Sequence, residues 1–262
     1  MAHWTKPRTW VDGETLTAAV FNTHLRDNLD FLRDADRVHA VQTQDNALKN
    51  DEWELLRFGG EAFDRGDMHN SRKREGQITF RQRGLYCILF KIAFEAIDAI
   101  IIEDIAAATG TDEFTKASHG LENGDVITLR SLGTITGVST NTNYYVVRAS
   151  SDTFKVSTSL GGSAENLTGS NDTVTAVRVP GERSVMLRRN ANGGSTGGHS
   201  LGVWISEATD DVETYTDGYV LTRMAKGDHL NLFVKQNSGA KKLKALSGSS
   251  GTSYLQAVQM GG

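Results

Sequence analysis

The chain has 262 residues and a formal net charge of −4, with 23% of its residues charged. This length suits one large β domain or two ordinary domains, and the slightly acidic balance gives no reason to expect nucleic acid or an anionic membrane as the main partner. Glycine is abundant (27) and proline scarce (2), as is typical of short strands joined by turns. The single cysteine, Cys87, cannot form an internal disulfide, and its apolar neighbours predict a buried, unreactive thiol.

The sequence shows no targeting or membrane segment. Its longest apolar run is far shorter than the roughly 20 residues that span a bilayer, and its first ten residues lack the apolar core of a signal peptide. We therefore expect a soluble protein that folds in a reducing cytoplasm without membrane insertion.

The clearest predicted helix lies near the N-terminus. Asp12-Gly13 marks a turn, and Thr17 is a residue type that caps helices. A helix of about 16–18 residues is marginal alone in water, so its apolar stripe must pack on something. Together with Trp10, this stripe is the predicted attachment surface of an N-terminal segment, residues 1–51. The stripe consists of residues at helical spacing, Phe21, Leu25, Leu29 and Leu32.

A weaker apolar pattern follows between Val38 and Leu48. It fits either a continuation of the helix or a stalk-like linker, and the sequence leaves both open. In either case, the β-rich body is expected to begin at residue 52.

The body contains strands rich in aromatic and β-branched residues. The segment Gly84–Phe94 is apolar on both faces of a strand, which indicates burial on both sides. One face is therefore expected to lie in the core and the other against an added domain or a second subunit.

Two later strands carry single large aromatics, Trp204 and Phe233, on otherwise polar faces. The opposite face of the first of these strands, with Leu201, Val203 and Ile205, is predicted to point inward. Together with the strand Gly84–Phe94, which is apolar on both faces, this pattern favours a subunit interface. Its predicted members are Tyr86, Phe90, Phe94, Trp204 and Phe233.

Residues 98–178 have a different texture. Short strands separated by turns follow one another roughly every ten to twelve residues, which predicts a compact inserted β module. The body is thereby divided into residues 52–97 and 179–262.

The body resembles the jelly-roll family of tumour necrosis factor and the globular head of complement. That resemblance implies two packed antiparallel sheets and, commonly, a tight trimer with aromatic residues toward the three-fold axis. The matching stretches are Phe63-Asp-Arg-Gly66, Gly84-Leu-Tyr86, Val185–Asn190, Leu221–Leu230 and Tyr254–Gln259.

Two further resemblances point to phage particles. The insertion is similar to a small β module of phage virion proteins, through His119–Val126, Tyr144–Val147, Asp152–Ser157 and Gly161-Gly162. The opening stretch, Trp10–Gly13 with Thr17–Ala19 and Asn22–Asn28, resembles the N-termini of phage tail and head-fibre proteins. In those proteins the segment attaches the protein to the particle.

The sequence offers no grouping typical of catalysis or metal binding. Its seven histidines lack zinc-site spacing, and Asp64–Asp67 and Glu207–Asp211 are interpreted as solvated turns in preference to calcium loops. The glycine-rich stretch Asn192–Gly198 is interpreted as a flexible loop, because it does not lead a strand into a helix with phosphate-binding spacing. We predict no catalytic, cofactor-binding or metal-binding residue, no cofactor and no enzymatic activity.

These observations together predict a mainly β protein, an antiparallel jelly-roll sandwich with an inserted small β domain and an N-terminal α-helical anchor. The resemblances imply a structural protein of a bacteriophage virion, a homotrimeric fibre, head decoration or minor tail protein whose partners are other capsid or tail proteins. A host cell-surface polymer is left open as a further partner, as is the choice between head and tail. The alternative is an enzyme, a tail-associated polysaccharide depolymerase, which would need two carboxylates facing each other across a cleft.

Overall fold

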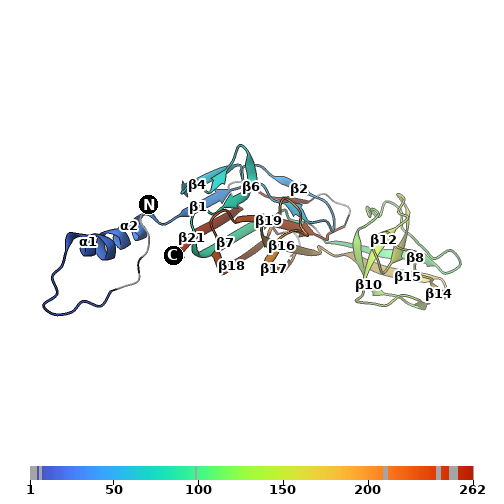
Figure 1. Cartoon of the computed structure of the whole chain (residues 1–262). Coiled ribbons are helices and arrows are strands. Elements are labelled where there is room, and N and C mark those ends of the chain that lie inside the picture. Colours follow the sequence, from blue (N-terminus) through green and yellow to red (C-terminus); the bar gives the residue numbers. More distant parts are fainter. Residues whose placement is uncertain are drawn as a thin grey trace.

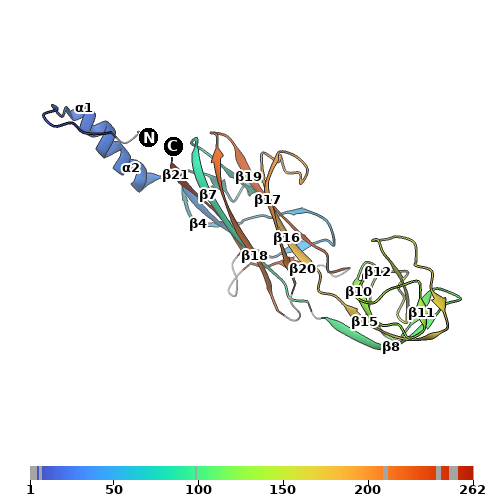
Figure 2. The same cartoon turned by 90° about the horizontal axis from the view of Figure 1, so that it is seen from below.

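The chain forms three parts in a row, an N-terminal helix, a β-sandwich and a small β-barrel (Figure 1 and Figure 2). The computed structural model describes residue 5 and residues 8–97, 99–208, 212–239, 243–247 and 253–261, apart from the side chains of residues 31–34. Among the described residues, no helix combines the length and the apolar character needed to cross a bilayer.

The N-terminal helix begins where the sequence predicts. The Thr17 hydroxyl accepts a hydrogen bond from the Val20 N–H at 3.3 Å, which caps the first turn. The helix runs through a π-helical turn in its middle, and its three segments are α1 (Ala18–Phe21), η1 (Asn22–Arg26) and α2 (Asp27–Asp34).

The segment before the helix, Thr5 and residues 8–17, folds back along it, and we call this segment the leader. The Thr5 N–H donates to Asn28 Oδ1 at 2.8 Å, and the Trp10 ring lies 6.2 Å from that of Phe21 and 6.4 Å from that of His24. The leader and helix project beyond the sandwich at the end opposite to the barrel (Figure 2).

Two antiparallel sheets build the sandwich. We name them after a central strand of each. The β7 sheet has the order β2–β20–β7–β21–β1–β4, with β18 on the other side of β7. Its strands are β1 (Arg37–Val41), β2 (Asn46–Leu48), β4 (Gly60–Arg65), β7 (Gly84–Phe94), β18 (Thr214–Met224), β20 (Leu243–Ala245) and β21 (Tyr254–Gly261).

The β16 sheet has the order β17–β16–β19–β6–β5, and β3 also pairs with β19. Its strands are β3 (Glu54–Leu55), β5 (His69–Asn70), β6 (Arg74–Thr79), β16 (Glu182–Arg189), β17 (His199–Glu207) and β19 (His229–Gln236). Both sheets contribute buried side chains to one core, including Phe58, Ile88, Val185, Leu232 and Leu255. This arrangement confirms the predicted antiparallel jelly-roll sandwich.

The sandwich begins earlier than the predicted residue 52. Val38, Ala40 and Leu48, which were assigned to a continued helix or a linker, lie on β1 and β2 and are buried in the core. Both readings of this segment are wrong, and the N-terminal segment 1–51 therefore includes two strands of the β7 sheet. The physical reason is the alternation of buried and exposed residues along β1, a period of two that marks a strand.

The insertion forms a closed barrel with its own core, in the order β10–β12–β13–β9–β8–β15. Its strands run from Ile100 to Arg178, inside the predicted range 98–178. They are β8 (Ile100–Ala108), β9 (Glu113–Thr115), β10 (Val126–Ser131), β12 (Asn143–Val147), β13 (Thr153–Ser157) and β15 (Asp172–Arg178), with a small ribbon of β11 (Ile135–Thr136) and β14 (Thr168–Gly169).

Candidate interaction surfaces

Four of the five residues predicted for a subunit interface lie in the interior of a single chain. Tyr86, Phe90 and Phe94 are at most 1% exposed and belong to the core between the two sheets. Phe233 is equally buried, packed with Met186 under β3. The prediction is wrong for these residues: the first three fill the space between the two sheets, and Phe233 is covered on the other side of its sheet by Trp53 and Leu55.

The opposite face of β7 is the surface that the chain leaves open. Leu85, Cys87 and Leu89 point away from the core and are half-buried, so the predicted burial of Cys87 is incomplete. Cross-strand neighbours continue this face on both sides, Tyr219 and Leu221 on β18 and Val258 on β21.

We call these six residues the outer face. Tyr219 is 73% and Leu221 57% exposed. The solvent side of an antiparallel sheet normally carries polar side chains, and a contiguous apolar patch there is typical of an interaction site.

The fifth predicted residue, Trp204, packs largely inward. Its ring meets that of Phe90 edge-on at 4.8 Å, and a Cβ added at Gly218 or Gly202 would come within 2.5 Å of the indole. These glycines therefore make room for the ring.

The exposed large apolar side chains of β17 are Val203 (49% exposed) and Ile205 (61%), which were predicted to point inward. That prediction is wrong, because a register shift opposite Leu187 and Arg188 interrupts the alternation of β17 and leaves Leu201 and Trp204 both packed against the core. The exposed apolar pair lies on the strand next to β18. Val203 pairs with Met186, on the side of the β16 sheet that faces away from the core between the sheets.

A polar and aromatic cluster borders the outer face on β1 and β4. His39 stacks on Tyr254 with ring centroids 4.7 Å apart, and Phe63 lies 5.6 Å from His39 on the other side. The Arg37 guanidinium sits over Phe63 at 5.9 Å, beside a cavity of about 540 Å³. The β7 sheet thus presents an apolar centre with a mixed rim, an anatomy typical of protein–protein interfaces.

The predicted attachment residues of the helix are exposed. Trp10, Phe21, Leu25 and Leu29 are between 43% and 58% exposed, so within this chain the leader covers the stripe only in part. The Leu32 side chain lies outside the described residues. Attachment through this stripe stays a prediction.

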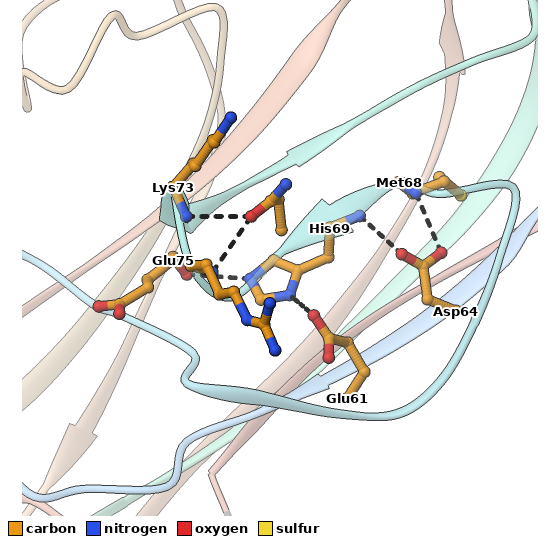
Figure 3. A network of polar contacts seen from close by, with 8 residues as sticks. Glu61, Asp64, Met68, His69, Lys73 and Glu75 are labelled. Carbon is orange, nitrogen blue, oxygen red and sulfur yellow. Dashed lines mark hydrogen bonds and ion pairs between the residues drawn. The ribbon is translucent and has the colours of Figure 1, made fainter.

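A buried histidine ties the two sheets together at one edge of the sandwich, a feature that sequence reasoning missed (Figure 3). His69 is 4% exposed; its Nδ1 lies 2.6 Å from Glu61 Oε1 and its Nε2 lies 3.1 Å from the Glu75 carbonyl. Glu61 is on β4 of one sheet, whereas His69 and Glu75 are on β5 and β6 of the other.

Asp64 completes this edge by capping the turn before β5. Its two oxygens accept hydrogen bonds from the Met68 and His69 N–H groups at 3.0 and 2.9 Å. The acidic stretch Asp64–Asp67 is thus a structured turn in which the Asp64 carboxylate binds backbone donors. The spacing Glu61–Asp64–His69 was the available signal, but nothing in one sequence shows that β4 and β5 meet.

The glycine-rich loop is held by a side chain, contrary to its interpretation as flexible. The Arg188 guanidinium donates to the carbonyls of Thr196, Gly197 and Gly198 at 2.6 to 3.2 Å. At the end of β16, Asn190 donates to Asp228 Oδ1 at 2.9 Å and accepts from the His229 N–H.

Burial shifts the pKa of several ionisable groups, including Asp36 and Arg183. Burial raises the pKa of Asp36, which lies between the helix and β1, although the Gln82 amide donates to it. Burial also lowers the pKa of Arg183 to about 10, where its guanidinium donates to Ser238 and to the Pro180 carbonyl beside the barrel.

Two cavities on the barrel lack the geometry for hydrolysis of a polysaccharide. A cavity of about 570 Å³ on the barrel is lined by Asn123, Arg148, Leu160 and neighbouring backbone, and another of about 540 Å³ has Glu103 and Asp104, which are adjacent on β8. Neither lining holds two carboxylates from different elements. Within the part of the chain that the structure describes, no group of three or more His, Cys, Asp or Glu side chains is placed to hold a metal ion.

Comparison with known proteins gives structural neighbours only. No protein-family model matches the chain, and no curated protein matches its sequence. Solved structures with a similar arrangement include the globular domain of zebrafish complement 1qA protein (8% identity, 86% of this chain and 97% of that chain, TM-score 0.41) and murine APRIL (9%, 86% and 99%, 0.42). A third is Eiger TNF from S. frugiperda (10%, 87% and 94%, 0.40). Because these TM-scores lie below 0.5, the jelly-roll assignment rests on the strand pairing described above.

Proposed function

We propose that this chain is a structural protein of a bacteriophage particle, a homotrimer whose jelly rolls associate through their outer faces and whose N-terminal segment attaches it to the particle. The observation that carries the trimer is the uncovered apolar outer face, with Tyr219 and Leu221 more than half exposed. The phage assignment is supported by the sequence resemblances of the insertion and of the opening stretch. The protein is then a component of the virion, which is assembled in the host cytoplasm.

The two exposed apolar regions suggest how the copies meet. The outer face covers the centre of the β7 sheet, while Val203 and Ile205 form a second exposed apolar patch on β17, the edge strand of the β16 sheet. A contact between two different patches is heterologous, and it closes into a ring when the rotation between neighbours is right. We expect the β17 patch of one copy to pack on the outer face of the next, so that three copies bury both regions.

A charge on the outer face tests the trimer. The full chain should have a mass in solution of about three times 28.5 kDa by light scattering. Tyr219→Asp or Leu221→Asp should give a folded monomer, because an ionised carboxylate cannot be buried in an apolar contact without a partner. Leu160→Asp, at an exposed leucine on the barrel, serves as the control and should stay trimeric. A monomeric unmodified chain would contradict the trimer, and purified virions that lack the chain by immunolabelling would contradict the particle assignment.

A further inference from the structure

The π-helical turn aligns the exposed stripe of the helix. In an α-helix, residues four apart drift around the axis because one turn takes 3.6 residues. A π-turn uses i→i+5 hydrogen bonds and takes more residues per turn, and here the Asp27 N–H donates to the Asn22 carbonyl. Phe21 directly precedes this turn and Leu25 lies within it, so the two side chains come closer to one line. The result is a narrow apolar seam, as in coiled coils, in place of the broad face of a helix that lies on a sheet.

The base of the helix is fixed to the sheet that carries the outer face. Only Ala35 and Asp36 separate α2 from β1. Asp36 is 4% exposed, and its backbone pairs with Gln259 of β21, with the Gln259 N–H donating to the Asp36 carbonyl at 2.9 Å and the Asp36 N–H donating to Gln259 Oε1 at 3.4 Å. If outer faces surround a common axis, the helices leave the sandwiches beside one another.

The flanks of the seam suit copies of the same helix. They carry both signs of charge, with an Arg26–Asp27 ion pair at 2.7 Å and Asp30 one turn further on. Mixed-sign flanks can form ion pairs between identical helices, whereas a strongly acidic or basic partner would be matched by a single sign.

We propose that Phe21, Leu25 and Leu29 form the seam of a three-helix bundle between copies of this chain. This proposal rests on the trimer proposed above and assigns the stripe to the protein's own copies, leaving the leader for the particle. The leader covers the His24 and Asn28 side of the helix and sets Trp10 beside Phe21, which stays 43% exposed. Val11 (68% exposed) and Leu16 (49%) of the leader remain accessible for contact with the particle.

Disulfide trapping in the full chain tests the bundle. In the chain that keeps Cys87, Leu29→Cys places a thiol on the seam and Thr23→Cys places one on the far side of the same helix, and the unsubstituted chain reports any dimer formed through Cys87. After mild oxidation of the trimer, Leu29→Cys should yield at least fivefold more covalent dimer than Thr23→Cys. Equal trapping in a chain that is trimeric by mass would overturn the bundle and leave the trimer standing, whereas a monomeric mass would overturn both.

Hydrogen exchange gives a second, independent readout. In the trimer, the amides of residues 24–30 should exchange at least tenfold more slowly than in the double variant Leu25→Asp/Leu29→Asp, because an isolated helix of this length frays in water. The double variant should remain trimeric through its outer faces. Exchange equally fast in both proteins would overturn the bundle.

Discussion

At the residue scale, His69 shows how one side chain joins two sheets. Its ring nitrogens meet a carboxylate of β4 and a carbonyl of β6, both hydrogen-bond acceptors, in a site with almost no access to water. Each ring nitrogen thus faces an acceptor from a different strand, and the imidazole bridges the two sheets.

His69→Leu should destabilise the sandwich by about 1–3 kcal/mol, since it leaves the Glu61 carboxylate and the Glu75 carbonyl without their donor. Urea unfolding followed by tryptophan fluorescence would measure the loss. The matched control is His199→Leu, at an exposed histidine on β17, which should change the free energy of unfolding by less than about 0.5 kcal/mol. Equal effects of the two substitutions would contradict the role given to His69.

The carboxyl group of Asp36 predicts a pH dependence of stability. Burial raises its pKa in the folded state above the ordinary value of 3.8, so the folded chain holds this proton more tightly than the unfolded chain. Its contribution to stability is therefore fully present below pH 3.8 and is lost as the pH rises through the folded-state pKa. Asp36→Asn keeps an oxygen for the Gln82 amide and removes the titration.

Urea unfolding of both proteins between pH 4 and pH 7 would test this expectation. The stability of Asp36→Asn relative to the unmodified chain should increase over that range, and a difference that is constant with pH would contradict it.

At the element scale, the helix was predictable and the faces of the strands were not. Thr17 and the spacing Phe21–Leu25–Leu29 mark the helix in the sequence, because capping and periodicity are local properties. In Gly84–Phe94, by contrast, both faces are apolar, so alternation alone does not say which one meets the second sheet. On β17 the register shift breaks the alternation, and the space for Trp204 depends on Gly218 of another strand. Such information is set by tertiary packing.

The loop of residues 190–198 gives a prediction for one element. The Arg188 guanidinium donates hydrogen bonds to three carbonyls of this loop. A methionine at position 188 keeps an unbranched side chain of similar reach but has no hydrogen-bond donors. Arg188→Met should speed amide exchange in this loop at least tenfold, while the amides of β16 and β19 keep their protection. Arg130→Met, at an exposed arginine of the barrel, is the control. Unchanged exchange in the loop would show that its glycines and turns alone define its shape.

At the scale of the whole molecule, composition and strand texture were enough to predict β domains with a second β unit inserted, whereas the sandwich itself was implied by the resemblance to the tumour necrosis factor and complement family. The boundary of the insertion followed from a change in strand length and turn spacing. The start of the sandwich did not, because β1 pairs with β21 at the other end of the chain, and a partner more than 200 residues away leaves no mark on the local sequence. Of the two exposed apolar surfaces, only the stripe of the helix could be predicted from the sequence, through its helical spacing. The outer face could be recognised only from the pairing of β18, β7 and β21.

The barrel should fold as an independent unit. It closes its own sheet and buries its own core, which includes Ile105, Phe114, Leu129 and Phe154. Contacts with the sandwich are concentrated at its base, where a Cβ added at Gly239 would come within 2.4 Å of Asp125.

Expressed alone, residues 98–179 should therefore give a cooperative thermal transition by circular dichroism. The chain with this segment replaced by a short Gly-Ser linker should keep a folded sandwich and the trimeric mass. The linker must join the end of β7 to the start of β16, and a flexible linker costs little in free energy because the closure entropy grows slowly with length. A sandwich that no longer folds without the barrel would show instead that the insertion is part of the jelly-roll core. The buried guanidiniums of Arg178 and Arg183, at the junction of the two units, would then be the first groups to test by substitution.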